Sequence, residues 1–276
     1  MSIRIDVDPA NSGQFFACCG LLELADRLWG FAEGWFETGT FHIRTEHAGA
    51  SLSKLLEAAR NFRLSENNGA SPDEEGDKEE EDSEDATGSL TIVSPISIRL
   101  DWWADKSIKT WAGSMKESKI FLAMCNAIDP QCTDPFNQGG VVFDAQLPPS
   151  PRTKTKLGKS GKKREPFYFD ARRGASAWSI DVGFSTDALG ISTVAHPVVE
   201  ALCFIGLQRC RPKPTETPRV FDYFAWRTPL PISIVPAAVS GVIGSGDCYR
   251  FTNSFRTDQK KHKTYTPATR TQRSPI

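Results

Sequence analysis

Apolar residues alternate or recur at helical spacing through the first sixty residues, and these patterns predict four elements. Residues 2–8 alternate apolar and polar positions, which is typical of a half-buried strand. Residues 14–29 place apolar side chains at helical spacing, although Gly20 lies inside this helix at a cost in stability. Residues 40–45 predict a second strand, and residues 51–62 predict a short amphipathic helix after a serine cap. The chain is therefore expected to open β-α-β-α.

The later patterns mix strands and helices without regular βαβ repetition. Residues 90–103 are strand-like but broken at Pro95, and proline is poorly tolerated inside a strand. The further elements expected are a helix over 114–128, a strand pair at 166–171 and 176–185, a helix over 197–209, and late strands within 219–235 and 248–257. This order predicts the α+β class, with mixed or antiparallel sheets and a few packed helices.

Composition divides the chain further. An N-terminal β-α-β-α part at 1–64 precedes an acidic loop at 65–88, which we expect to be disordered because it offers too little apolar surface to bury. The α+β body then continues over 89–257, with a flexible basic loop at 146–165, and a basic tail covers 258–276.

The formal net charge of −1 hides a basic body. Residues 73–85 contain ten acidic residues and one lysine, so this run alone contributes −9 and the rest of the chain carries +8. A basic surface attracts polyanions, of which nucleic acids are the most common.

Most of the seven cysteines lie in apolar segments, which favours core thiols in a reducing compartment over a disulfide framework. Two pairs, Cys125 with Cys132 and Cys203 with Cys210, have a spacing that would share a helix face but exceeds the usual zinc spacing. We therefore expect core packing and no metal. No secretion signal or membrane-length apolar run is apparent, so a cytoplasmic protein that does not enter a membrane is expected.

Two basic segments suggest contacts with nucleic acid. Residues 152–164 hold seven basic residues and no acid. Residues 250–263 combine further cations with aromatic residues, including Phe251 and Phe255. Cations bind phosphate and bases stack on rings. A plain solvated basic surface is the alternative.

The segment 99–113 contains three tryptophans beside Arg99, Lys106 and Lys109. Adjacent strand positions face opposite sides, so either Trp102 or Trp103 should be less buried than the other. An exposed tryptophan between cations would suit base stacking or a partner pocket, whereas core packing is the alternative.

Three arginines follow strand-like aromatic segments, namely Arg172, Arg173 and Arg227. Arginine at a strand end can bind phosphate through paired donors. Equally, these side chains could pair with nearby carboxylates such as Asp170, Asp181 or Asp222.

No complete catalytic centre is apparent, and we expect neither a cofactor nor an enzyme. Asp6 and Asp8 would share a strand face and could bind a divalent ion, but such a pair is more often the solvent-facing side of an edge strand. Of the four histidines, His262 is the weak catalytic candidate, because the lysines around it would hold phosphate. An ordinary exposed histidine is the alternative.

Several strings carry a resemblance to a known system. They are DPANSGQFFACCGLLELADRLW (8–29) with AEGWFETGTF (32–41), RLDWW (99–103), KTWAG (109–113), FDARRGASAWSIDVGFS (169–185), VFDYFAWRTPLPISI (220–234) and FRTDQKKHK (255–263). Together they resemble an accessory or effector-module protein of type I-G CRISPR–Cas systems, formerly called type I-U or Dpsyc. The helix and the W-F-x-x-G-x-F strand after it are also similar to the start of the large effector subunit of that subtype.

The resemblance implies a role in antiviral defence and a ferredoxin-like fold related to the RAMP subunits of such complexes. Expected partners are guide RNA, target DNA and other type I-G effector subunits, with sequence read by base pairing. The alternatives are a metal-independent endoribonuclease that processes guide RNA, with His262 as base, or a protein-only adaptor that recruits the helicase–nuclease. The inferred nucleic-acid contacts are Arg99, Trp103, Lys106, Lys109, Trp111, Arg172, Arg173, Arg227, Arg256, Lys260, Lys261 and Lys263.

Overall fold

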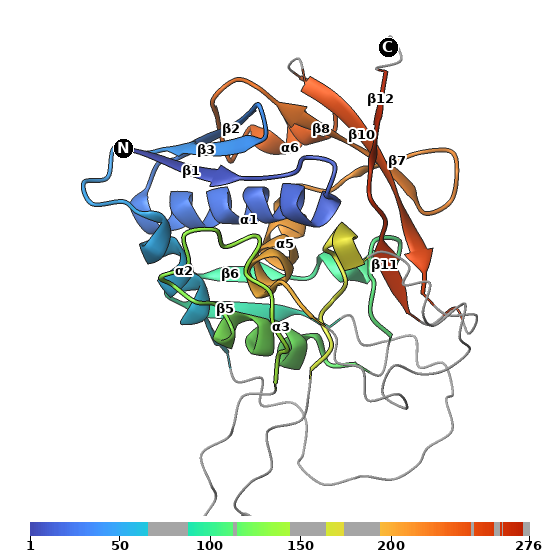
Figure 1. The fold of residues 1–276 in the computed structure, drawn as a ribbon, viewed down its shortest axis with the longest axis horizontal. Helices are drawn as coiled ribbons and strands as arrows, with labels where there is room; N and C mark the ends of the chain where they lie inside the picture. Colours follow the sequence, from blue (N-terminus) through green and yellow to red (C-terminus); the bar gives the residue numbers. More distant parts are fainter. Residues whose placement is uncertain are drawn as a thin grey trace, which may run out of the picture.

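Two helices that are buried on all sides, α1 (Ser12–Trp29) and α5 (Pro197–Arg209), form the centre of the molecule (Figure 1). Every residue is buried from Ser12 to Ala25 and from Pro197 to Leu207. A helix that is apolar on all faces belongs in the interior, where neighbours cover each side.

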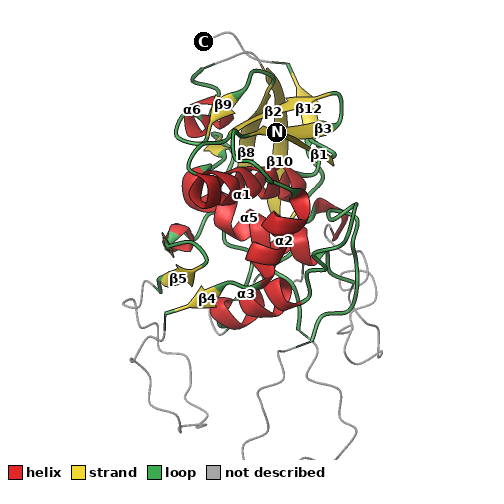
Figure 2. Cartoon of the chain, turned by 90° about the vertical axis from the view of Figure 1, so that its left-hand side faces the viewer, coloured by secondary structure: helices red, strands yellow, loops and turns green. Residues whose placement is uncertain are grey.

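The computed structural model describes residues 1–65, 88–112, 115–143, 164–173, 194–243, 246–256, 260 and 262–272. One layer of strands lies on one side of the helix pair, and α3, β4 and β5 lie on the other (Figure 2). The class is α+β, as the sequence predicted, and the paired strands within each sheet are antiparallel. The expected acidic and basic loops fall largely outside the described residues.

The first sheet has the strand order β1-β3-β2-β9. Its strands are β1 (Ser2–Asp6), β2 (Glu33–Glu37), β3 (Thr40–Arg44) and β9 (Leu230–Pro231). The predicted strands at 2–8 and 40–45 are confirmed, whereas β2 was not predicted as a separate element. The first three strands and α1 are arranged as in half of a ferredoxin-like fold, but β9 extends the sheet beside β2 instead of beside β1.

The second sheet is built around β10 and has the order β11-β10-β8-β7, with β12 also paired to β10. Its strands are β7 (Lys213–Pro214), β8 (Val220–Trp226), β10 (Gly246–Phe255), β11 (Lys263–Tyr265) and β12 (Thr269–Thr271). The predicted late strands are present, but residues after β8 turn into β9 and a short helix, α6 (Val235–Val239).

A third, smaller sheet has the order β4-β5-β6, with β4 (Arg63–Leu64), β5 (Leu90–Ser94) and β6 (Ile98–Leu100). It packs near α2 (Leu52–Arg60) and α3 (Glu117–Asn126). The predicted serine cap is confirmed, because the side chain of Ser51 accepts a hydrogen bond from the Lys54 amide. Short 3₁₀ turns, η1 (Trp102–Ala104) and η2 (Ala171–Arg173), complete the described elements.

The strand predicted at 166–171 is not formed. The amides of Phe169 and Asp170 donate to the buried carboxylate of Glu200, at 3.3 and 3.2 Å, so no neighbouring strand is needed to satisfy them. Its predicted partner at 176–185 lies outside the described residues.

Two glycines allow α1 and α5 to cross at backbone contact. A Cβ atom at Gly20 would lie 2.0 Å from the carbonyl oxygen of Leu202, and one at Gly206 would lie 2.0 Å from that of Phe16. No side chain fits at these distances, so the glycine inside the predicted helix has a packing reason.

Six of the seven cysteines are buried, as expected for core thiols, and Cys132 is partly exposed. Cys125 and Cys132 do not share a helix face, because α3 ends at Asn126. Within the described residues, no helix combines the length and apolar character that crossing a bilayer requires.

Candidate nucleic-acid interface

The end of β10 and the strand β11 bring late cations against an early segment of the chain. The Lys263 amide donates to the carbonyl of Thr110 at 2.8 Å, and its Nζ atom donates to the carbonyl of Lys106 at 3.1 Å. The buried side-chain amide of Asn253 donates to the carbonyls of Ser107 and Lys109 at 2.9 and 3.2 Å. Residues 106–110 are thereby fixed along the edge of the second sheet.

Phe255, at the end of β10, lies under two cations. The guanidinium carbon of Arg219 is 4.4 Å from the centroid of the ring, and Nζ of Lys263 is 6.0 Å from it. Cations at these distances are attracted by the negative face of the ring. The ring therefore helps to hold two positive charges close together.

Two further cation–ring pairs lie on the same surface. The guanidinium carbon of Arg256 is 3.4 Å from the ring centroid of Tyr168, and Nζ of Lys109 is 5.1 Å from that of Trp111. Tyr168 is joined to β11, because its carbonyl accepts from the amide of Tyr265 at 3.1 Å. We call Lys106, Lys109, Arg219, Arg256, Lys260 and Lys263 the cationic surface.

The charges of this surface perturb one another. Burial lowers the pKa of Lys263, and the nearby Arg219 and Lys109 lower it further, against the opposing effect of Asp105. The pKa of Lys109 is likewise lowered by burial and by Lys106, against the opposing effect of Glu117. A bound anion would relieve this repulsion.

Backbone strain also concentrates here. Tyr168, Arg219 and Lys260 have φ angles of 69°, 64° and 56°, and they are three of the four non-glycine residues with positive φ in the described part of the chain. Few side chains adopt this region. Such strain often occurs at functional sites, where the surrounding structure holds it in place.

Three of the predicted contacts, Lys106, Lys109 and Lys263, come together on this surface, and two more, Arg256 and Lys260, lie in the connection between β10 and β11. Lys261 lies outside the described residues. Sequence reasoning missed Arg219 and Tyr168. Arg219 is an isolated cation before a strand, so only its contact with Phe255, distant in sequence, assigns it to the surface.

The prediction of a surface tryptophan is wrong. Trp102, Trp103 and Trp111 are all buried. Residues 102–104 form a 3₁₀ turn, in which successive side chains do not alternate between opposite faces. The indole nitrogen of Trp102 donates to the carbonyl of Phe204 at 2.8 Å. These rings belong to the core around α5.

The predicted arginines outside the surface pair with carboxylates. Arg172 donates to the fully buried Asp170, with Nη2 2.6 Å from Oδ2, and also to the carbonyl of Phe136 at 2.6 Å. This pairing was one of the two predicted alternatives. These bonds occupy guanidinium N–H donors of Arg172 that a phosphate would otherwise accept from.

The other two predicted arginines whose side chains are described also lie beside carboxylates. Arg227 pairs with Asp247 at 2.8 Å instead of with Asp222, which binds Arg250. Arg99, on β6, lies 3.7 Å from Asp101. The side chain of Arg173 is outside the described part of the chain.

Asp170 is the centre of a buried polar network. Asn11, the N-cap of α1, donates to Asp170 at 2.8 Å and accepts from the amide of Ala171 at 3.0 Å. Nδ1 of His196 lies 3.2 Å from Asp170. Burial raises the pKa of Asp170, but Arg172, Asn11 and His196 outweigh it, so its pKa lies below the ordinary value.

The weak catalytic candidates do not form a recognisable centre. His262 lies within the cationic surface, where its carbonyl accepts from the Arg256 amide at 2.8 Å, and its catalytic role stays a prediction. Asp8 lies beyond the end of β1 and accepts from the Ala10 amide at 2.9 Å, so it closes a turn instead of facing a ligand with Asp6. No group of three or more metal-ligating side chains is found among the residues described.

Comparisons of the chain with models of protein families, with curated proteins and with solved structures find no match. The description of the site therefore depends on its geometry alone. It is a group of closely spaced cations that contact aromatic rings at one edge of the second sheet.

Proposed function

We propose that the chain is a non-catalytic nucleic-acid-binding subunit of a type I-G CRISPR effector complex. The observation that carries the binding role is the cationic surface, to which three separate parts of the chain contribute cations: residues 106–109, Arg219, and the hairpin of β10 and β11. The effector context is supported by the sequence strings that resemble proteins of this system.

The surface suits phosphate better than bases. Trp111 and Tyr168 are buried, and the rings of Phe255, Tyr168 and Trp111 already have protein cations beside them. The exposed groups of the surface include the positive charges of Lys106, Arg219 and Lys260, which can bind the backbone without reading sequence. This matches a subunit that leaves sequence recognition to base pairing.

Reversing three exposed charges should weaken binding and its salt dependence together. The variant carries Lys106→Glu, Arg219→Glu and Lys260→Glu. We expect affinity for a single-stranded oligonucleotide to fall by about ten- to a hundredfold at low salt, and the slope of log K against log salt to become shallower by about 2. Fluorescence anisotropy over a series of salt concentrations measures both quantities.

The matched control reverses three exposed cations near α2, with Lys54→Glu, Arg60→Glu and Arg63→Glu. Figure 1 shows α2 and β11 on opposite sides of the molecule. An equal loss in both variants would mean that net charge, not the cationic surface, drives binding. An unchanged affinity in the first variant would contradict the proposal.

The effector context needs a separate experiment. The tagged protein is purified together with its neighbouring gene products, and the bound nucleic acid is sequenced. Enrichment of guide RNA is the expected result. Bound nucleic acid without guide sequences would remove the CRISPR context and leave the binding role.

A further inference from the structure

A cleft lies at the opposite end of β10 from the cationic surface. It occupies about 540 Å³ between the turn that joins β2 to β3 and the strands β8 and β10. This volume is in the range of small-molecule sites. The lining residues used below are Trp35, Glu37, Arg227, Asp247 and Tyr249.

Two partly exposed aromatic rings line the cleft, and each is held by a second ring. The indole of Trp35 stacks on His42, with centroids 4.9 Å apart and an angle of 7° between the planes. Tyr249 stacks on Tyr223, at 5.5 Å and 16°. Rings fixed in this way lose little conformational entropy when a flat ligand packs on them.

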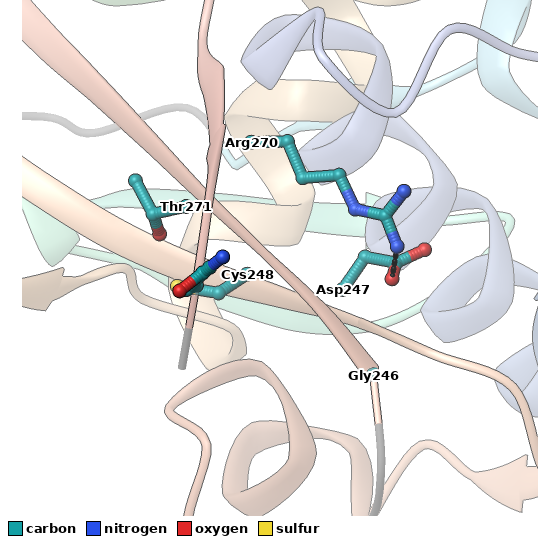
Figure 3. Close-up of a pocket in the computed structure, with 6 residues that line it drawn as sticks. Gly246, Asp247, Cys248, Arg270 and Thr271 are labelled. Carbon is teal, nitrogen blue, oxygen red and sulfur yellow. Dashed lines mark hydrogen bonds and ion pairs between the residues drawn. The ribbon is translucent and has the colours of Figure 1, made fainter. Parts of the chain in front are cut away.

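Charged groups surround the rings. Asp247 lies between Arg227, at 2.8 Å, and Arg270, and Figure 3 shows Arg270 reaching it from β12. Burial raises the pKa of Asp247, but the two arginines outweigh it and keep the carboxylate ionised. The side chain of Glu37 is 67% exposed, and its carboxylate lies 3.5 Å from His42.

We propose that the cleft binds one base of a single-stranded nucleic acid, a base that carries an exocyclic amino group. The base packs against Trp35 and Tyr249, and Glu37 accepts a hydrogen bond from the amino group. Arg227, whose side chain is 63% exposed, lies at the rim and contacts the adjoining phosphate. The proposal rests on the proposed function, because a nucleic acid must reach the protein first.

The position of the cleft supports a nucleic-acid base as the occupant. Tyr249 and Phe255 belong to the same strand and are six residues apart, which corresponds to about 20 Å. The side chains between them on the same face, Phe251 and Asn253, are buried, so a single strand that joins the two sites crosses the outer face of β10 and not this one. The ring of Tyr249 is partly exposed in the cleft and can stack with a base, whereas the ring of Trp35 already has the guanidinium carbon of Arg44 5.8 Å from its centroid.

Removing either ring should weaken binding without changing its salt dependence. With Trp35→Leu or Tyr249→Leu, we expect affinity for a single-stranded 15-mer to fall by about 5- to 100-fold, because a stacked base is lost. The slope against salt stays as in the unmodified protein, since no phosphate contact is removed. Trp29→Leu is the matched control, because Trp29 stacks on His47 at 5.8 Å and is not part of the cleft lining.

Base preference tests the role of Glu37. The unmodified protein should bind adenine- or cytosine-containing homopolymers more tightly than uracil homopolymers, and Glu37→Ala should remove this preference. An unchanged preference overturns the assignment of Glu37. Equal losses for Trp35→Leu and Trp29→Leu overturn the cleft as the base site.

The cleft and the proposed function can fail separately. If the triple charge reversal abolishes binding but the ring variants leave it unchanged, the cleft proposal is wrong and the proposed function remains. If oligonucleotides do not bind at all, the fluorescence of the tryptophans is followed on addition of adenosine or cytidine monophosphate. A response lost in Trp35→Leu keeps the cleft and removes the proposed function, and no response overturns both.

Discussion

Replacement of Gly206 by alanine is expected to lower the free energy of unfolding by at least about 3 kcal/mol, or to prevent folding, because the added methyl overpacks the core. In an ordinary helix the same change would stabilise the protein by about 1 kcal/mol through helix propensity. Here the added Cβ atom would lie 2.0 Å from the carbonyl oxygen of Phe16. This oxygen belongs to the helix backbone, which cannot move away by a change of rotamer as a side chain can. The two central helices would have to separate, and the packing along their buried faces would be lost.

Denaturant unfolding followed by circular dichroism measures this effect. Gly140→Ala is the matched control, because a Cβ atom at Gly140 meets nothing within 4 Å, and it should change the stability by less than about 0.5 kcal/mol. An unfolding midpoint for Gly206→Ala equal to that of the unmodified protein would show that the helices do not cross at backbone contact.

Asp170→Asn should lower the free energy of unfolding by about 3 kcal/mol, as expected when one partner of a buried ion pair is removed. The side chain of Asp170 is fully buried, whereas that of Arg172 is 34% exposed, so water can compensate part of the loss. Asp222→Asn is the control, since the side chain of Arg250 is 48% exposed and the pair should contribute less than about 1 kcal/mol. Equal effects in the two variants would contradict a structural role for the network.

The same substitution should alter the response to acid. The pKa of Asp170 is lower in the folded protein than in the unfolded chain, where it is about 3.9. The ionised carboxylate therefore contributes its full stabilisation above the unfolded pKa, and this contribution is lost as the pH falls through the folded pKa. Asp170→Asn should therefore make stability fall less steeply below about pH 4. Some acid dependence remains, because Glu23, bound by Arg27 and Arg209, also has a lowered pKa.

Local sequence patterns predicted the elements whose formation depends mainly on residues adjacent in the sequence. Alternation identified β1, and the cap at Ser51 identified α2, because both depend on neighbouring residues. The strand predicted at 166–171 failed for the opposite reason. Its amides are satisfied by Glu200, a residue thirty positions away that no local pattern connects to them.

Of the residues in the site, the sequence predicted only the cations that lie close together along the chain. Lys260 and Lys263 lie in one basic run, and Lys106 and Lys109 lie in another, so both were found. Arg219 joins them only through folding. Conversely, the sequence around Arg172 is typical of a phosphate contact, but Arg172 is bound to Asp170. Trp103 is buried because residues 102–104 form a 3₁₀ turn, which the alternation of apolar and polar residues does not predict.

The crossing of α1 and α5 also has a consequence during synthesis. Phe16 and Gly206 are 190 residues apart, so α1 emerges long before its main partner exists. At 5 to 20 residues per second, this delay is about 10 to 40 s. Throughout that interval the apolar surface of α1 can be covered only by early strands or by a chaperone, which makes the nascent chain prone to aggregation until the second helix leaves the ribosome.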